Sequence, residues 1–405
     1  MATKKVILSA YSCDPSKGSE PGNGYNWADQ LAIYGHQVYC ITTSKGKEPI
    51  EKARQNNPNL EVAYIDLPFG LDKMYYWTQL GMYMHYLIWQ WLAYRHAKQA
   101  HKKKKFDLAH HVTWGSLQQG SFLYKLPIPF LFGPAGGGQK APEAFKNYFN
   151  EHWATEVKRE KISKLLQAIN PACKAMVKRA KVIFAANEDT LKMAEQMGAK
   201  KVVHLLDAAL PKTFFEATNF IDKEDREELK LLWVGRFLPR KGILLILDVM
   251  KELKKQPSVT LTIVGDGDMK DAFLTKRKEY GLENQINWVG KVPFDQVRNY
   301  YSDHDAFFFT SLRDSGAVQL IEAMAFGLPV ITLDLHGQGL MINEDRGFKA
   351  SVDDPKKTIS ELSSFILKLA RDRNELKRLS KNAHAYAIKQ TLENKIEYIS
   401  KEFYC

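Results

Sequence analysis

Cysteine is scarce in this chain. Only four of its 405 residues are cysteines, and they lie far apart, at Cys13, Cys40, Cys173 and Cys405. A disulfide scaffold uses many more cysteines in a short chain, and a zinc site needs its ligands at short, regular spacings. The scarcity therefore excludes both, and it is what we expect of a protein from the reducing cytoplasm.

Long hydrophobic runs are also missing. The apolar run from Val6 to Ala10 is too short for a signal peptide. Residues 74–94 carry no Asp, Glu, Lys or Arg, but they hold eight Tyr or Trp and few aliphatic side chains. Trp and Tyr favour membrane interfaces over the bilayer centre. Large side chains recur there at helical spacing, at Trp77, Leu80, Met84, Leu87 and Trp91. We therefore predict a long amphipathic helix rather than a membrane span.

Signatures of bound cofactors are absent as well. The glycines of residues 18–24 do not form the G-x-G-x-x-G fingerprint of dinucleotide-binding folds, because a third glycine is missing after Gly24. No Asp-x-Asp motif follows a predicted strand. Asp303 and Asp305 precede one, and we interpret them as part of a turn. We expect neither an NAD-type cofactor nor a metal.

Basic residues are in excess. Lys and Arg number 58 against 46 Asp and Glu, a net charge of +12. This favours anionic partners such as phosphates, nucleic acid or an acidic membrane surface. The sequence shows no aromatic RNA-binding signature and no finger or helix-turn-helix pattern, so nucleic-acid binding would rest on charge alone. We therefore expect no nucleic-acid partner.

Strand-like and helix-like segments alternate in two series. Strands of the first series are predicted at residues 5–10, 37–42, 60–65, 108–112, 128–132 and 181–185. Strands of the second are predicted at residues 231–235, 259–264, 286–289, 306–310 and 329–332. Helices are predicted at residues 25–34, 243–254, 319–325, 356–372 and 375–398, and residues 14–24 form a Gly-rich loop. This alternation predicts an α/β protein of two Rossmann-like domains, each with a parallel sheet covered by helices.

The two series set the domain boundaries. We assign residues 1–210 to the N-terminal domain, 211–385 to the C-terminal domain, and 386–405 to a helix that packs back towards the N-terminal domain. Open α/β sheets bind ligands at the carboxyl ends of their strands. We therefore expect the site in a cleft where the two domains face each other.

Two cations follow the first strand of the second series. Gly235 permits close backbone approach, and Arg236 and Lys241 lie five residues apart on the connecting loop. Arg binds phosphate oxygens as a planar fork and Lys as a compact charge. The loop therefore suits a diphosphate leaving group, which it would neutralise without a metal. A solvated basic loop is the alternative.

Two acids follow the strand at residues 306–310. Asp314 lies on the loop, and Glu322 lies about two turns into a helix that Gly316 opens. The N–H groups of a helix start suit an anion. The donors expected here belong to Gly316, Ala317 and Val318. We place Asp314 on sugar hydroxyls and Glu322 on a ribose diol. The alternative is a surface loop followed by an ordinary helix carboxylate.

Glycines also follow strands in the first series. Gly22 and Gly24 lie in the Gly-rich loop after the first strand, and Gly136 and Gly137 follow the strand at residues 128–132. Both loops suit close backbone approach to a ligand. We take Gly22 and Gly24 as donor-binding candidates and Gly136 and Gly137 as acceptor-side candidates. A flexible loop or a tight turn without ligand contact is the alternative.

Two adjacent histidines end the strand at residues 108–112. Alternation along a strand sends His110 and His111 to opposite faces, so only one can point into the expected cleft. We favour His110 as the catalytic candidate and keep His111 as an acceptor-side candidate. For either, the alternative is a buried histidine in a structural hydrogen bond.

Taken in order, these motifs resemble those of the family-four glycosyltransferases of the GT-B fold. The resemblance rests on Gly235 to Gly242, Val264 to Gly267 and Asp314 to Pro329 in the second half. In the first half it rests on Gly18 to Trp27, Gly35-His36 and Asp107 to His110. It covers nearly the whole chain. It implies a metal-independent, retaining transfer of a sugar from a nucleoside diphosphate to a hydroxyl group.

The resemblance also implies roles for single residues. Arg236 and Lys241 would hold the diphosphate, Glu322 the ribose, and His110 the donor sugar or the reacting centre. Asp314 stands where the family has its first Glu, which contacts the donor sugar. The side chain is one methylene shorter, which bears on the identity of the sugar more than on the reaction class. The stretch after Asp314 also lacks the family's usual aromatic residue.

The acceptor is expected on the N-terminal domain. There the aromatic segment 74–94 precedes Arg95, Lys98 and the run from Lys102 to Lys105, a pattern that suits an anionic membrane surface. We predict peripheral contact with the inner face of the membrane and a glycan or lipid-linked acceptor, in polysaccharide or cell-envelope glycan synthesis. A core helix with a solvated basic end is the alternative. A GT-B sugar-nucleotide epimerase and a basic nucleic-acid-binding protein remain as other functions.

Overall fold

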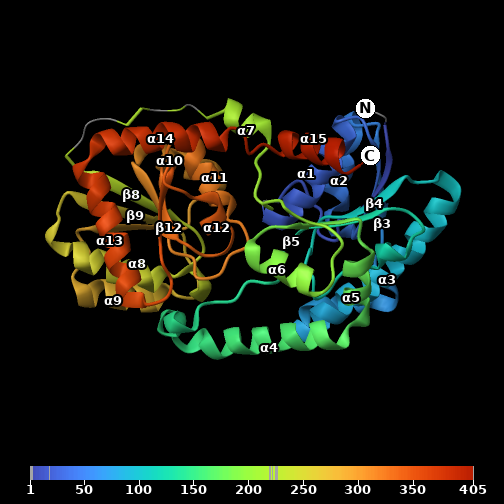
Figure 1. The fold of residues 1–405 in the computed structure, drawn as a ribbon, viewed down its shortest axis with the longest axis horizontal. Helices are drawn as coiled ribbons and strands as arrows, with labels where there is room; N and C mark the ends of the chain where they lie inside the picture. Colours follow the sequence, from blue (N-terminus) through green and yellow to red (C-terminus); the bar gives the residue numbers. More distant parts are fainter. Residues whose placement is uncertain (1–2, 18, 219, 221, 224–226, 405) are drawn as a thin grey trace. The chain divides into compact units, whose positions relative to one another are not determined.

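The computed structural model describes residues 3–404 except Gly18, Asn219, Ile221 and residues 224–226 (Figure 1). The chain forms two compact units. The first comprises Met1–Gly138, Lys161–Asp207 and Leu392–Cys405, and the second Gln139–Glu160 and Ala208–Thr391. The sequence predicts a domain boundary after residue 210 and a C-terminal segment that returns to the first domain from residue 386. It assigns residues 139–160 to the first domain, whereas in the structure they belong to the second unit.

The first unit is built on a parallel sheet of seven strands in the order β3-β2-β1-β4-β5-β6-β7. The strands are β1 (Lys5–Ser9), β2 (Gln37–Thr42), β3 (Leu60–Tyr64), β4 (Leu108–His111), β5 (Phe130–Ala135), β6 (Val182–Ala185) and β7 (Val202–His204). Its α-helices are α1 (Ser19–Ile33), α2 (Lys47–Ala53), α3 (Gln79–Lys104), α5 (Pro171–Arg179), α6 (Glu188–Gln196) and α15 (Leu392–Glu402). Short 3₁₀ helices are η1 (Ser44–Gly46), η2 (Arg54–Asn56), η3 (Pro68–Tyr76) and η4 (Phe122–Lys125). Because the strand order reverses between β1 and β4, the switch point of this sheet lies at their carboxyl ends.

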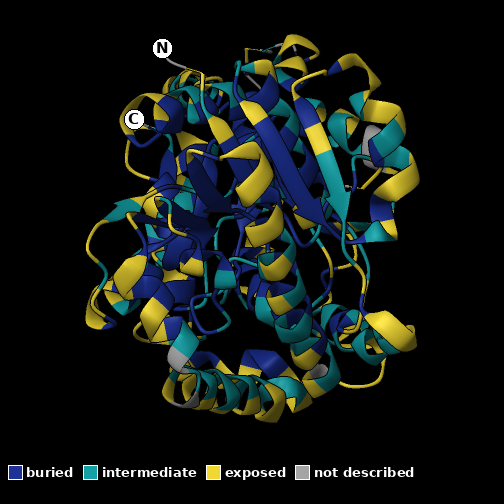
Figure 2. Cartoon of the chain, turned by 90° about the vertical axis from the view of Figure 1, so that its right-hand side faces the viewer, coloured by how far each residue is buried: buried dark blue, intermediate teal, exposed yellow. Residues whose placement is uncertain are grey.

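The core of the first unit lies between this sheet and the helices α3 and α5. Tyr86 and Trp89 of α3 are fully buried in it, and the Trp89 indole donates to the Ile65 carbonyl at 2.8 Å. Figure 2 shows several strands of the sheet dark blue, one strand largely teal and yellow, and outer turns of the helices exposed. A parallel sheet with both faces covered needs strands that are apolar on both sides, which is why β6 is apolar throughout and Val6 to Leu8 of β1 form an apolar run.

The C-terminal helix α15 belongs to the first unit. It contacts α1, and the His36 ring shares a hydrogen bond with the Ser400 hydroxyl at 3.0 Å. The Tyr404 hydroxyl lies 2.7 Å from Nδ1 of His110 on β4. These contacts join the end of the chain to the centre of the first sheet.

The second unit has a parallel sheet of six strands in the order β10-β9-β8-β11-β12-β13. The strands are β8 (Leu229–Val234), β9 (Val259–Val264), β10 (Ile286–Gly290), β11 (Ala306–Phe309), β12 (Val330–Leu333) and β13 (Gly347–Ala350). Its α-helices are α7 (Lys212–Glu216), α8 (Ile243–Glu252), α9 (Lys270–Tyr280), α10 (Phe294–Asp303), α11 (Val318–Ala325), α12 (His336–Met341), α13 (Pro355–Arg371) and α14 (Arg373–Ala387). It also holds η5 (Glu143–His152), η6 (Pro239–Lys241) and η7 (Leu253–Lys255), and α4 (Trp153–Ile169) runs from this unit into the first. The switch point of this sheet lies at the carboxyl ends of β8 and β11.

The core of the second unit is formed by the sheet with α8 and α13. Trp233 of β8 and Leu245 of α8 are fully buried, as is Leu362 of α13. Asp354 caps α13 by accepting from the Lys357 N–H at 2.9 Å, and Pro355 occupies its first turn. These local signals fix where the helix begins, and its apolar stripe fixes which face is buried.

The predicted strands agree with the observed ones to within three residues at each end. Strands β2 and β9 have the predicted bounds. The edge strands β7 and β13 were not predicted, because each has only three or four residues and a mixed pattern. The single helix predicted at residues 375–398 is two helices, α14 and α15, separated by residues 388–391.

The predicted Gly-rich loop at residues 14–24 is wrong for its second half, because α1 begins at Ser19. A Cβ at Gly22 would lie 2.3 Å from the Lys17 carbonyl, and one at Gly24 would lie 2.0 Å from the Ser12 carbonyl. The glycines therefore let this helix lie against the preceding segment. Close tertiary packing outweighs the low helix propensity of glycine here.

The aromatic segment also differs from its prediction. Residues 68–76 form η3, and α3 runs from Gln79 to Lys104, ten residues past the predicted end. The Thr78 side chain caps α3 by accepting from the Gly81 N–H at 3.0 Å. No helix in the described part of the chain is both long and apolar enough to cross a bilayer.

Candidate functional site at the carboxyl ends of β8 and β11

The strongest group of charged residues lies at the switch point of the second sheet. Strands β8 and β11 are neighbours there, and the loops that follow them begin at Gly235 and Thr310. Arg236 and Lys241 lie on the first loop, and Asp314 lies on the second. The fold thus brings together residues that are more than 70 positions apart in sequence, at the edge where open α/β sheets bind their ligands.

Glycines allow the loop after β8 to lie against its neighbours. Gly242 has a left-handed φ of 66°, and a Cβ there would lie 2.2 Å from the Thr310 carbonyl. Gly265 has a φ of 142°, and a Cβ there would lie 1.8 Å from the Gly235 carbonyl. This packing seats the end of η6 against the end of β11, which places Lys241 beside Asp314.

Lys241 and Asp314 form a buried ion pair. The Lys241 ammonium donates to the Asp314 carboxylate, and the Arg240 guanidinium lies 3.3 Å from the same oxygen. Burial acts to raise the pKa of Asp314, but the charges of Lys241 and Arg240 hold it below its ordinary value. Burial lowers the pKa of Lys241, and Asp314 opposes that shift. The pair thus keeps a cation at the switch point.

Arg240 was not predicted as a site residue. Its guanidinium donates to the Arg313 carbonyl at 3.0 Å, in addition to its contact with Asp314. The sequence signal was its place next to Lys241 in the same basic loop. Glu156 was also missed, and it ion-pairs with Arg313 at 2.7 Å from residues 139–160. No local pattern indicates that contact.

Arg236 has a different environment from Lys241. Its side chain is exposed, and within the described residues no hydrogen bond or ion pair holds its guanidinium. Its charge nevertheless acts on Lys241, where it helps to lower the pKa of the ammonium. The structure thus brings Arg236, Lys241 and Asp314 into one charged group at this edge of the sheet, and their ligand roles stay predictions.

Two helices begin at this edge without a side-chain cap. The residue before α8 is Gly242, and the residue before α11 is Ala317, and neither start has a capping side chain. Uncapped starts leave backbone N–H groups that suit an anion. The predicted donors Gly316 and Ala317 precede α11 and Val318 is its first residue, so the helix begins two residues after Gly316 and one residue before the predicted start at residue 319.

A short helix that the sequence did not predict supports the loop after β11. The Gln338 side chain of α12 donates to the Ser311 carbonyl at 2.8 Å. A Cβ at Gly337 would lie 1.9 Å from the Ser315 carbonyl, so the backbone of α12 touches the loop. This contact fixes the path of the residues that carry Asp314 and Gly316.

Glu322 is buried on the inner side of α11. Its carboxylate accepts from the Tyr301 hydroxyl at 2.9 Å, and burial raises its pKa above the ordinary value. It is the fifth residue of α11, hence one turn into the helix rather than two. Its side chain is 6% exposed. No contact in the described structure joins it to the group of Arg236, Lys241 and Asp314.

The N-terminal histidines lie at the centre of the first sheet. His110 has both ring nitrogens bonded, to the Tyr404 hydroxyl at 2.7 Å and the Gly133 carbonyl at 2.8 Å. His111 is bonded to the Ser9 hydroxyl at 2.9 Å and the Tyr86 hydroxyl at 3.2 Å. Both are fully buried, and burial lowers their pKa to about 4 and about 3. They are neutral structural hydrogen-bonding groups here, and the catalytic role of His110 stays a prediction.

The glycine loops of the first unit are packed against protein. Gly22 and Gly24 lie inside α1, as described above. Gly136 donates to the Gly115 carbonyl at 2.8 Å, and Gly137 accepts from the Gln118 amide at 2.6 Å. Their predicted ligand roles are therefore untested, and the close contacts give a packing reason for glycine at these positions.

Two further features bear on the location and chemistry of the site. Among the described residues, no group of three or more His, Cys, Asp or Glu side chains is arranged to hold a metal ion.

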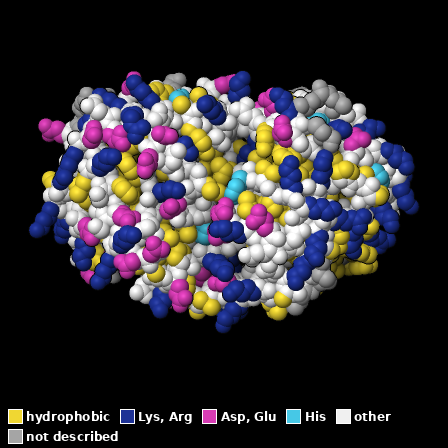
Figure 3. All heavy atoms as spheres, viewed as in Figure 1, with side chains coloured by type: hydrophobic (Ala, Val, Ile, Leu, Met, Phe, Trp, Pro, Cys, Tyr) yellow, Lys and Arg dark blue, Asp and Glu magenta, His cyan; other side chains and the backbone are white. Residues whose placement is uncertain are grey.

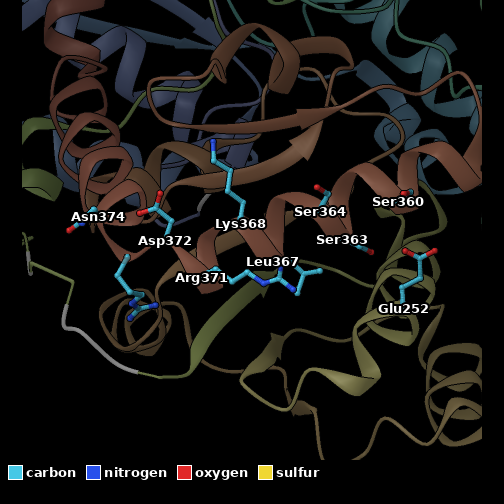
Figure 4. Close-up of a pocket in the computed structure, with 10 residues that line it drawn as sticks. Glu252, Ser360, Ser363, Ser364, Leu367, Lys368, Arg371, Asp372 and Asn374 are labelled. Atoms are coloured by element: carbon cyan, nitrogen blue, oxygen red, sulfur yellow. The ribbon is translucent and has the colours of Figure 1, made fainter.

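A hollow of about 1080 Å³ lies beside α13 and α14 and includes Glu252 and Arg371 (Figure 4). These residues end α8 and α13, which run back from the carboxyl ends of the strands. The hollow therefore lies at the opposite edge of the sheet from Lys241 and Asp314.

A match to a known protein family covers most of the second unit. Residues 214–386 match the family described as glycosyl transferases group 1. The amylovoran biosynthesis glycosyltransferase AmsD of Erwinia amylovora is 30% identical over 148 residues, which are 36% of this chain and 41% of AmsD. The matched part of the chain thus spans about two fifths of the length of this curated relative.

Comparison with solved structures covers both units. Sucrose-phosphate synthase from Thermosynechococcus elongatus has a TM-score of 0.69 at 18% identity, over 99% of this chain and 98% of that one. HepE from Anabaena, solved in complex with UDP, has a TM-score of 0.63 at 16% identity, over 98% of each chain. These likenesses show that the chain has the GT-B fold, as the sequence predicted.

Proposed function

We propose that this chain, whose residues 214–386 match the family described as glycosyl transferases group 1, transfers a sugar from a nucleoside diphosphate sugar to a hydroxyl group. The observation that carries the proposal is the group of Arg236, Lys241 and Asp314 at the switch point of the second sheet. The starts of α8 and α11, which have no side-chain cap, directly follow the two loops that carry these residues. A diphosphate matches both kinds of donor, because it carries negative charge and accepts hydrogen bonds.

The reaction would break the bond between the anomeric carbon and the diphosphate oxygen. A bond forms between that carbon and the acceptor oxygen, and the hydroxyl proton passes to the departing diphosphate. Negative charge gathers on the leaving group as the bond breaks. Lys241 and Arg236 would stabilise this charge, and the backbone N–H groups near Gly316 would add to it. The cationic charge required is supplied by the chain's own side chains.

The nucleoside would lie towards α11. Glu322 would accept hydrogen bonds from the ribose hydroxyls, with Tyr301 holding its carboxylate in place. This needs the buried Glu322 side chain to reach the ligand from beneath the loop. Because HepE was solved with UDP, UDP-sugars are the first donors to test and GDP-sugars the second.

Asp314 would have two roles. In the structure it binds Lys241 and Arg240, so it fixes the direction of both cations before the donor arrives. Its second carboxylate oxygen accepts from the Ser315 N–H at 3.1 Å, which orients the group. We infer that it also contacts the donor sugar. Transfer would proceed with retention of anomeric configuration, as the resemblance of the motif implies.

The acceptor would bind the first unit. His110 would support the first unit from within the core, since both its ring nitrogens are already bonded. The match to a glycosyltransferase of amylovoran biosynthesis supports a polysaccharide or cell-envelope glycan as product. A lipid-linked or glycan hydroxyl is the acceptor class that we propose.

A donor screen tests the proposal directly. The purified chain is incubated with UDP- and GDP-sugars, with and without a mixture of glycan and lipid-linked acceptors, and release of nucleoside diphosphate is measured. Acceptor-dependent release with one donor supports transfer. Sugar interconversion or diphosphate release that no acceptor changes favours the epimerase alternative. No turnover or binding of any nucleotide sugar contradicts the proposal.

A further inference from the structure

The exposed hydrophobic side chains of the chain are concentrated in one segment. Eleven large hydrophobic side chains are exposed in the described part of the chain, and six of them lie between residues 69 and 91. They are Phe69, Tyr76, Trp77, Leu80, Met84 and Trp91. Scattered exposed apolar residues need no explanation, but a contiguous group marks an interaction surface. This segment comprises η3 and the first half of α3.

The exposed side of α3 is apolar in the first half of the helix and basic in the second half. Leu80, Met84, Leu87 and Trp91 recur every three or four residues, and Arg95, Lys98 and Lys102 continue the same row. These residues therefore share one side of the helix, over roughly 33 Å at 1.5 Å per residue. The opposite side is the buried one, formed by Tyr86, Trp89, Ala93, Ala97 and Ala100. The alternative of a core helix, given in the sequence analysis, applies only to this inner side of α3, whose side chains are buried.

The basic half of this row is available to anions. Lys98, Lys102, Lys103 and Lys105 are exposed, and within the described residues none of them has an ion-pair partner. Arg95 stacks on the Trp91 ring at 4.7 Å, which joins the apolar half to the basic half. No Asp or Glu occurs in the 26 residues of α3. In Figure 3, Lys and Arg gather around hydrophobic side chains at the right-hand part of the face, where Figure 1 places α3.

Phe69 extends the apolar half. It has a left-handed φ of 58°, and its side chain is 99% exposed. Bulky residues rarely adopt this conformation, and here no burial of the ring accompanies it. The turn of η3 thus presents an aromatic ring to solvent, as do Tyr76 at the end of η3 and Trp77 after it.

We propose that the exposed face of η3 and α3 docks the chain onto an anionic lipid bilayer. Phe69, Trp77, Leu80, Met84 and Trp91 would enter the interfacial region, and Arg95, Lys98 and Lys102 would lie at the lipid phosphates. Aromatic rings favour that depth, and basic residues are attracted to the negative surface. A protein groove would need acidic groups matching a basic row of this length, whereas a bilayer offers negative charge along all of it. This proposal does not depend on sugar transfer.

Flotation with lipid vesicles tests the docking. The full chain is mixed with vesicles of phosphatidylcholine alone, or of equal parts phosphatidylcholine and phosphatidylglycerol, at low and high salt. We expect flotation with the anionic vesicles at low salt and a loss of binding at high salt, because salt screens exposed charges over about 10 Å at 0.1 M. Absence of flotation at low salt, or equal binding to both vesicle types, would overturn the proposal.

Matched variants assign the surface. We expect Trp77→Ala with Leu80→Ala, and separately Lys98→Glu with Lys102→Glu, to lower vesicle binding by about tenfold or more. The controls remove equally exposed groups elsewhere in the first unit: Ile33→Ala with Leu165→Ala, and Lys174→Glu with Lys200→Glu. Thermal melting establishes that each variant is folded. Equal losses in test and control variants contradict the assignment. The assignment is also contradicted if the parent chain dimerises without vesicles and the Trp77→Ala, Leu80→Ala variant is monomeric. That result would identify the surface as a protein interface.

Discussion

Lys241 donates a hydrogen bond to the carboxylate of Asp314, which lies 73 residues away on the loop after a neighbouring strand. Both groups are largely buried, so neither charge is solvated as it would be on the surface. Breaking such a pair leaves an uncompensated buried charge. The contact therefore stabilises the fold and also holds a cation where a diphosphate would bind.

Removing the ammonium of Lys241 should abolish most of the transfer. Lys241→Met keeps the aliphatic bulk, and we expect kcat/KM for the donor to fall about a hundredfold or more, because one positioned charge contributes roughly 3 kcal/mol to a transition state. Asp314 keeps Arg240 as a partner, so the variant should remain folded. The matched control is Lys278→Met on the exposed face of α9. Equal rates in the two variants would remove Lys241 from the mechanism.

The Asp314 carboxylate should give a defined dependence of stability on pH. Its native pKa is lowered, so its contribution is present above the ordinary Asp pKa and is lost as pH falls through the native value. Asp314→Asn should lower the free energy of unfolding by about 3 kcal/mol at neutral pH, with a smaller difference in acid. Urea unfolding of both chains across this pH range measures it. A difference that does not change with pH contradicts the ion-pair account.

The length of the acid at position 314 should affect the donor sugar. Asp314→Glu adds one methylene, which moves the carboxylate by about one bond length. We expect the ratio of kcat/KM between two donor sugars to change by about tenfold or more. Competition between sugar nucleotides measures the ratio. An unchanged ratio would place Asp314 away from the sugar.

The contribution of Glu322 to stability should depend on pH with the opposite sign to that of Asp314. Its native pKa is raised by burial, so stability falls as pH rises from the ordinary Glu value through the native one. Glu322→Gln keeps an acceptor for the Tyr301 hydroxyl and removes the charge. We expect it to be more stable than the parent at neutral pH, by on the order of 1 kcal/mol, and equal to it in acid. Its affinity for UDP should fall about tenfold, because charge-assisted bonds to the ribose are lost.

His110 should make the first unit sensitive to acid. Its pKa of about 4 lies below the ordinary value, so the unfolded chain binds more protons between the two, and stability is lost as pH falls through that window. The loss amounts to up to about 3 kcal/mol. His110→Gln should show a weaker dependence over the same range, measured by thermal melting. A parent chain whose melting temperature is constant between pH 6.5 and 4, taken as about the limits of this window, would contradict the buried neutral state.

Much of the fold could be predicted from the sequence because buried parallel strands leave clear apolar runs. The strand at residues 259–264 and the one at residues 37–42 are examples. Placing Arg236, Lys241 and Asp314 at one edge also followed, since carboxyl ends of neighbouring parallel strands meet.

The parts that the sequence did not reveal depend on contacts between distant segments. Gly22 and Gly24 favour a loop locally, yet packing against Ser12 and Lys17 makes them helical. The spacing of Trp77, Leu80 and Trp91 predicts a helix, but only the sheet decides that Tyr86 and Trp89 are the buried side. Glu156 reaches Arg313 from residues that the sequence assigned to the other domain.

The central claim is that the cations after β8 hold a nucleoside diphosphate. The most direct measurement is calorimetric titration of UDP and of GDP into the parent chain, Lys241→Met and the control Lys278→Met. The account predicts that one nucleotide binds the parent and the control equally, and that Lys241→Met weakens its binding about tenfold or more. It also predicts a higher melting temperature for the parent when that nucleotide is present. Binding that is unchanged in Lys241→Met, or absent from the parent with both nucleotides, would contradict the account.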